Sequence, residues 1–163
     1  MSLFNRRTLL LIPLALAACG FEPVYAPGGS GAALNGNVAV SAPNTVDSFL
    51  LVQNLEQQLG RSANSGQDYM LDVSVSTVTQ AAAITQTNEI NRLIIDGRAS
   101  YALKSGESGQ VLASGEVTDF VGYSAAGSTV STLADERDAK QRLMVILADQ
   151  IVNRLYAVPD LSK

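Results

Sequence analysis

The sequence predicts an α+β protein, a two-layer sandwich in which a mostly antiparallel four-stranded sheet carries two helices on one face. The strands are indicated by segments in which apolar and polar residues alternate, joined by short polar turns. The helices are indicated by two segments whose apolar residues recur at a spacing of three and four. Along the chain these segments follow the order β-α-β-β-β-α, which is typical of a sheet with helices packed on a single side.

Residues 1–18 have the pattern of an export signal. Arg6 and Arg7 precede an apolar run that is too short to cross a bilayer, which takes about 20 residues. The run ends in Leu-Ala-Ala before Cys19, an arrangement that resembles the lipobox of bacterial lipoproteins. The resemblance implies cleavage before Cys19 and acylation of its thiol and new amino group, for example with palmitate. Gly20 stands where aspartate would mark retention in the inner membrane, so we expect the outer membrane.

Two alternatives to this interpretation stay open. One is an ordinary secreted protein whose cysteine falls near the cleavage site by chance. The other concerns the route, because the paired arginines also resemble a twin-arginine export signal, although such pairs are common in signals of the general secretory route. Lipidation of Cys19 would anchor the protein stably to the membrane, since it supplies more than one acyl chain.

Composition excludes several classes of function. The chain carries 11 basic against 15 acidic residues, a poor balance for binding nucleic acid. It has no histidine and only one cysteine, so we expect no disulfide, no metal site with nitrogen or thiolate ligands and no histidine-based catalysis. We therefore expect a protein that is not an enzyme and has no cofactor, no metal and no catalytic residues.

The rest of the chain divides into three parts. Residues 19–35 are interpreted as the lipidated N-terminus and a flexible tether, because glycine and proline interrupt them repeatedly. Residues 36–158 hold all the predicted strands and helices and form a single α+β domain, beginning with a short strand near residue 38. Residues 159–163 are a C-terminal tail.

Both helices have recognisable ends. The first is predicted from Val46 to Leu59, with Thr45 as its cap and Gly60 as its stop. The second starts at a cap on Ser131 or Thr132 and ends before Pro159. Each helix has an apolar stripe that we expect to face the sheet. The stripe of the first comprises Val46, Phe49, Leu50, Leu55 and Leu59, and that of the second Ala139, Leu143, Leu147, Ile151 and Leu155.

Three strands are predicted between the helices. They cover residues 69–77, 91–104 and 111–123, and a Gly- and Ser-rich turn at 105–109 joins the last two. Residues 81–88 have no clear period and are interpreted as a strand end and a hairpin connection. In the middle strand the apolar residues share one face, which should take the helices: Leu93, Ile95, Ala99, Tyr101 and Leu103.

The opposite face of that middle strand carries three basic residues, Arg92, Arg98 and Lys104. The plain interpretation is a solvated sheet face. The alternative is a binding site for an anionic ligand, because a guanidinium group matches the geometry of phosphate oxygens. Asp96 lies among the three and weakens the local positive potential, so we expect modest affinity.

Several of these features together resemble one family. The sequence Cys-Gly-Phe-Glu-Pro-Val-Tyr at 19–25 follows a lipobox, and the β-α-β-β-β-α order ends in a long helix. This combination resembles the lipopolysaccharide-assembly lipoprotein family LptE in its alphaproteobacterial form. The resemblance implies an outer-membrane lipoprotein that lodges in the lumen of the large (LptD-like) barrel of the lipopolysaccharide translocon. There it acts as plug and assembly partner, with lipopolysaccharide as a candidate ligand.

One departure bears on that ligand. The loop before the last helix, 124–132, carries no Lys or Arg, so barrel association is better supported than direct lipopolysaccharide binding. Two other interpretations remain. A periplasmic lipoprotein that serves as auxiliary subunit of another lipid-transport system would share the anchor and the fold. A lipoprotein enzyme is the third, opposed by the missing nucleophile–base pairs.

Overall fold

The sheet consists of three long strands and one short one. They are β1 (Val38–Val40), β2 (Tyr69–Ile84), β3 (Ile90–Ser105) and β4 (Val111–Ser124), which lie side by side in that order. β2, β3 and β4 form an antiparallel meander, and β1 pairs in parallel with only the first three residues of β2. The prediction of a mostly antiparallel four-stranded sheet is confirmed.

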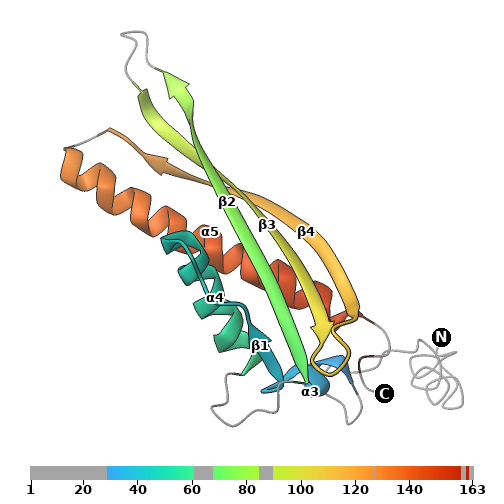
Figure 1. The fold of residues 1–163 in the computed structure, drawn as a ribbon. Helices are drawn as coiled ribbons and strands as arrows, with labels where there is room; N and C mark the ends of the chain where they lie inside the picture. Colours follow the sequence, from blue (N-terminus) through green and yellow to red (C-terminus); the bar gives the residue numbers. More distant parts are fainter. Residues whose placement is uncertain (1–28, 61–67, 85–89, 127, 159–160, 162–163) are drawn as a thin grey trace, which may run out of the picture.

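The computed structural model describes residues 29–60, 68–84, 90–126, 128–158 and 161. The predicted export signal and Cys19 lie outside the described residues. These described ranges contain three helices, α3 (Ser30–Leu34), α4 (Val46–Leu59) and α5 (Thr129–Tyr156). Figure 1 shows α4 and α5 side by side behind the three long strands, so one face of the sheet is covered and the other is open. No helix in the described ranges is both long and apolar enough to span a membrane.

The two long helices begin at polar caps. The Thr45 hydroxyl accepts a hydrogen bond from the Ser48 N–H, and Gly60 closes α4 in the left-handed conformation at φ +74°, which glycine adopts without strain. The predicted cap of α5 on Ser131 or Thr132 is wrong, because Ser128 caps this helix, three residues before Ser131. The α4 boundaries match the prediction.

The core lies between the helices and the covered face of the sheet. The predicted α5 stripe is confirmed, since all five of its residues are buried. The predicted inward face of β3 is confirmed as well. Its fully buried members meet the helices together with residues of the neighbouring strands, among them Leu71, Ile95, Ala99, Leu103 and Val117.

The stripe predicted for α4 is partly wrong. Val46 is 76% exposed and Phe49 is 56% exposed. The buried face keeps the predicted Leu55 and Leu59 and otherwise consists of Ser48, Leu51 and Val52. Both sets have helical spacing, and contact with α5 and the sheet selects the second.

The structure also extends the fold beyond the predicted limits. Part of the expected tether, Ser30–Leu34, is helical, and Leu34 is fully buried. At the other end, Leu161 of the expected tail is buried, and the Tyr69 hydroxyl donates to its carbonyl. β2 continues through Ile84 past an irregularity in register at Ala81, which accounts for the missing alternation there.

Candidate ligand-binding face of the sheet

The three predicted basic residues all lie on the open face. Successive side chains of a strand alternate between faces, and Arg92, Arg98 and Lys104 have the parity opposite to the buried Ile95 and Leu103. Arg92 and Arg98 are exposed, and Lys104 is half-buried. The structure therefore places them on one face of one strand, where a ligand could reach them.

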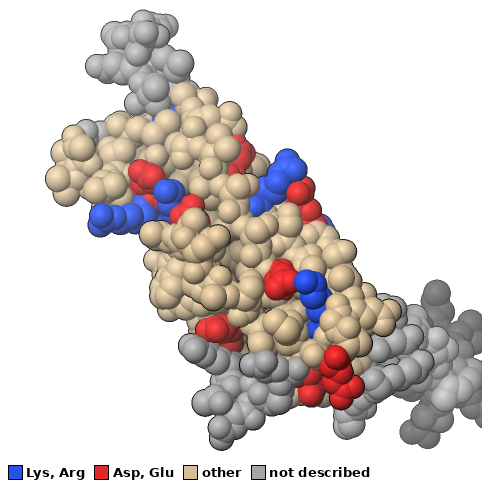
Figure 2. Space-filling model, in the orientation of Figure 1, with Lys and Arg blue, Asp and Glu red and all other residues tan. Residues whose placement is uncertain are grey.

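Two of these cations are paired with carboxylates of the neighbouring strands. Arg98 Nη1 lies 2.9 Å from Glu116 Oε1 on β4, and Lys104 Nζ lies 2.6 Å from Asp72 Oδ2 on β2. In both pairs the acidic residue is two positions along the neighbouring strand from the residue directly opposite the cation. A long side chain can span this diagonal distance. Figure 2 accordingly shows basic and acidic groups next to one another on this face. The pairing lowers the positive potential that Arg98 and Lys104 offer to an anion.

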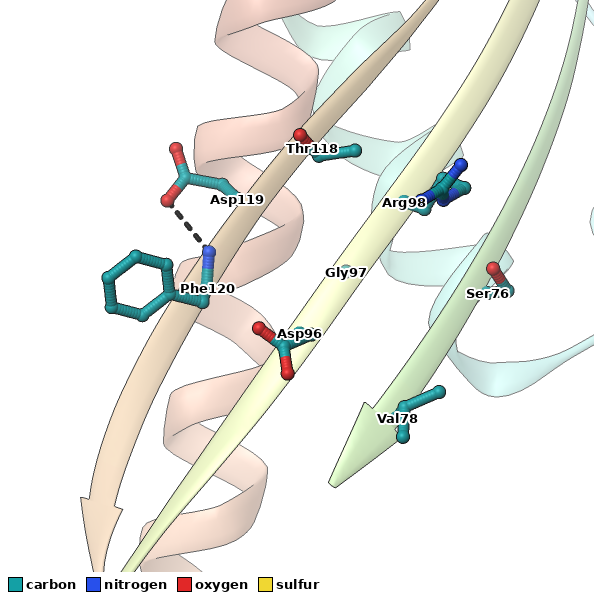
Figure 3. A pocket seen from close by; sticks show the side chains of 8 residues that line it. All are labelled: Ser76, Val78, Asp96, Gly97, Arg98, Thr118, Asp119 and Phe120. Atoms are coloured by element: carbon teal, nitrogen blue, oxygen red, sulfur yellow. Dashed lines mark hydrogen bonds between the residues drawn. The ribbon is translucent and has the colours of Figure 1, made fainter. Parts of the chain in front are cut away.

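A hollow of about 690 Å³ lies on the same face beside Arg98. In the row of residues across its floor, Val78, Asp96 and Phe120 stand opposite one another on β2, β3 and β4. Val78 and Phe120 are 64% and 63% exposed, and the Gln80 amide donates to the Asp96 carboxylate. Figure 3 shows the side chains of Val78, Asp96 and Phe120 around Gly97. The hollow thus combines a charged centre with apolar walls.

Sequence reasoning missed the apolar and acidic members of this face. Val78 falls just beyond the predicted end of its strand, and Phe120 lies in a strand whose alternation is blurred by Gly115 and Gly122. Glu116 and Asp72, the acidic partners of Arg98 and Lys104, could be identified only from the pairing register between the strands. That register is interrupted between Leu103 and Lys104.

A second, smaller hollow of about 380 Å³ lies where β4 passes into α5. Ala125, Thr129, Thr132, Leu133 and Glu136 line it. In the described part of the chain no group of three or more acidic or cysteine side chains could hold a metal ion.

Comparison with known proteins links this sequence to a protein family. A family model described as LptE, lipopolysaccharide-assembly, matches residues 36–155, most of the chain. A search of curated proteins finds no significant match.

Solved structures of lipoproteins share the fold. One, described as a lipoprotein from Caulobacter crescentus CB15, has a TM-score of 0.66 at 19% identity, and the match covers 78% of this chain and 93% of that one. Rare lipoprotein B from Shewanella oneidensis has a TM-score of 0.56 at 10% identity, covering 74% and 92%. Lipoprotein B from Nitrosomonas europaea has a TM-score of 0.52 at 12% identity, covering 85% and 91%.

Proposed function

Because the chain belongs to the LptE lipopolysaccharide-assembly family, we propose that it is an outer-membrane lipoprotein that acts as plug and assembly partner of the lipopolysaccharide-translocating β-barrel. The family match over residues 36–155 is the observation that carries this proposal. The lipobox-like sequence before Cys19 supports the anchor. The chain would thus act by holding and shaping a partner rather than by catalysis.

Direct contact with lipopolysaccharide is the second element of the proposal. Its support is the exposed face that holds Arg92, Arg98 and Lys104, because arginine and lysine side chains bind phosphate groups. The carboxylates of Glu116 and Asp72 compete for two of these cations. We therefore expect binding that is modest and salt-dependent.

A detergent pull-down of the full-length lipoprotein tests the proposal. Recovery of a large outer-membrane barrel protein is the expected result. Recovery of an inner-membrane transporter instead would favour the alternative, an auxiliary subunit of another lipid-transport system. A matched pull-down with an unrelated outer-membrane lipoprotein as bait identifies proteins that bind any lipidated surface.

A further inference from the structure

The sheet has two edges of very different character. At one side no strand of the described residues pairs with the outer side of β4, which is the last strand. At the other side β1 covers only the first three residues of β2, Tyr69–Leu71, so most of β2 is also an edge. Unpaired edges are sites where another strand can add, and soluble proteins usually block them.

The β4 edge is blocked by side chains. The Asp119 carboxylate accepts from the backbone N–H of Phe120 at 2.8 Å, as Figure 3 shows. Arg154 Nη1 donates to the carbonyl of Glu116 at 2.6 Å, and Gln150 holds the other Asp119 oxygen at 2.7 Å. These bonds from α5 and from β4 itself occupy backbone groups that an added strand would need.

Beyond Val73, the described residues give the β2 edge no such bonds. Residues at odd positions of β2 turn their backbone groups toward β1: the Tyr69 N–H donates to the Asn37 carbonyl, and the Val73 N–H donates to the Ser41 hydroxyl. The same alternation turns Val75, Thr77 and Thr79 outward, beyond the last contact with β1. Within the described ranges, no group bonds to the outward N–H and C=O of these three residues.

The composition of this edge fits strand addition. From Val73 through Ile84 the strand contains no charged residue, no proline and no glycine, and it is rich in β-branched side chains. Charges and proline are the usual means of blocking an edge, and β-branched residues favour extended pairing. The edge is therefore both available and suited to an uncharged strand.

The start of α4 lies beside this edge. Thr77 Oγ1 donates to Asp47 Oδ2 at 2.8 Å, which fixes the first turn of α4 next to the middle of β2. That turn carries the exposed Val46 and Phe49. The first turn of α4 therefore lies close to the place where β1 stops pairing with β2.

We propose that the free edge of β2, at Val75, Thr77 and Thr79, receives an uncharged extended segment of the outer-membrane partner as an additional β-strand. This inference rests on the proposed function, because the partner is the barrel protein named there. Main-chain hydrogen bonds would supply affinity, and alternate side chains of the incoming segment would supply specificity.

A second copy of this chain fits the edge less well. Antiparallel pairing of two β2 edges places the two ends that carry α3 at opposite ends of a joined sheet, and a single β2 of 16 residues already spans roughly 50 Å. Residues 19–29 reach at most roughly 40 Å even when fully extended. A joined sheet standing upright on a membrane would therefore hold one of the two anchors out of reach of the bilayer.

Amide hydrogen exchange on the full-length lipoprotein, alone in detergent and co-purified with its barrel partner, tests the proposal. The N–H groups of Val75, Thr77 and Thr79 should exchange rapidly in the free protein and become protected in the complex, while that of Thr118 on β4 should not change. Thr79→Pro removes an N–H that the described sheet does not use and should reduce recovery of the barrel roughly tenfold. Thr79→Val, which keeps the N–H and the β-branched shape, should not reduce it.

The outcomes separate the two proposals. A complex in which these amides stay unprotected would overturn strand addition and leave the barrel partnership intact. Protection in the free protein together with a doubled particle mass would overturn it in favour of a second copy. Failure to recover any barrel would overturn both. A normal melting temperature for Thr79→Pro shows that reduced recovery does not come from misfolding.

Discussion

Gly97 on β3 packs directly against Leu143 on α5. A methyl group on Gly97 would approach Leu143 Cδ2 to 2.9 Å and Leu147 Cδ1 to 3.1 Å. The long helix α5 therefore lies closer to the sheet at this point than a side chain at position 97 would permit. Both leucines are fully buried. The absence of a side chain at one position thus sets the distance between the two layers.

We expect Gly97→Ala to lower the free energy of unfolding by about 1–3 kcal/mol, the usual range for overpacking. Gly122→Ala on β4 is the matched control, because its new methyl group would meet nothing closer than the Leu93 carbonyl at 3.7 Å. Its effect should stay below about 0.5 kcal/mol. Urea unfolding of both variants measures the difference, and equal losses would contradict close packing at Gly97.

Local signals allowed much of the fold to be predicted. The boundaries of α4 follow from Thr45 and Gly60, whose roles depend only on the adjacent backbone. The predictions that were wrong concern features that depend on contacts between residues far apart in the sequence. The stripe with Val46 and Phe49 has helical spacing too, and only packing against α5 shows that it faces solvent. The helix α3 lies in a Gly-rich segment, and the Ser30 hydroxyl reaches a partner 126 residues away, the Tyr156 carbonyl.

The candidate site was predictable only in part, for a related reason. Alternation along one strand places Arg92, Arg98 and Lys104 on a single face, and the structure confirms that placement. The carboxylates that neutralise Arg98 and Lys104 come from other strands. Their positions depend on the pairing register, which the hairpin turns and a local irregularity determine.

Truncation of Leu34 tests whether α3 belongs to the folded domain. Leu34 is fully buried, so Leu34→Ala should cost about 2–5 kcal/mol of unfolding free energy. Leu133→Ala removes the same atoms from a side chain that is 47% exposed and should cost under about 1 kcal/mol. Thermal unfolding compares the two. If the Leu34→Ala protein were as stable as the control, Ser30–Leu34 would belong to the flexible tether and not to the folded domain.

Tyr123 should make stability depend on alkaline pH. Burial raises the pKa of its hydroxyl above the ordinary 10.0, and the Glu136 carboxylate raises this pKa further, while Lys140 acts in the opposite sense. The unfolded chain therefore ionises first as pH rises. The contribution of Tyr123 is complete below about pH 10 and is lost as pH climbs through the raised pKa.

Tyr123→Phe has no group to ionise, so its stability should fall less steeply between about pH 9 and 11. Chemical denaturation at several pH values gives the two slopes. If the unfolding free energies of the two proteins changed equally with pH, Tyr123 would ionise equally well in the folded and unfolded states.

Cys19 should carry the membrane anchor. We expect Cys19→Ser to accumulate as an uncleaved precursor, because lipidation of the thiol precedes cleavage in the lipobox pathway that Leu16 to Cys19 resembles. Intact-mass spectrometry of the wild type should show acyl chains on a chain that begins at Cys19. An unmodified thiol in the mature protein would exclude the anchor.

Binding of lipopolysaccharide to the open face can be tested with variants that should weaken it and with variants that should strengthen it. Replacing Arg92, Arg98 and Lys104 by serine should weaken binding at low salt and leave the melting temperature nearly unchanged, since exposed ion pairs contribute only about 0–1 kcal/mol. Removing the competing acids, with Glu116→Gln and Asp72→Asn, should have the opposite effect. These changes free Arg98 and Lys104 from partners at 2.9 and 2.6 Å and keep the shape of both side chains.

The salt dependence separates specific contact from a general change in charge, because added salt screens exposed charges. Lys140 and Glu136 on α5 form a pair at 3.1 Å away from the open sheet face, so Glu136→Gln is a control with the same charge change at another site. If the cations of β3 bind lipid phosphates, Glu116→Gln should tighten binding and Glu136→Gln should not. Equal affinities for both variants and for the triple serine variant, measured at low ionic strength with purified lipopolysaccharide, would exclude the open face as its binding site.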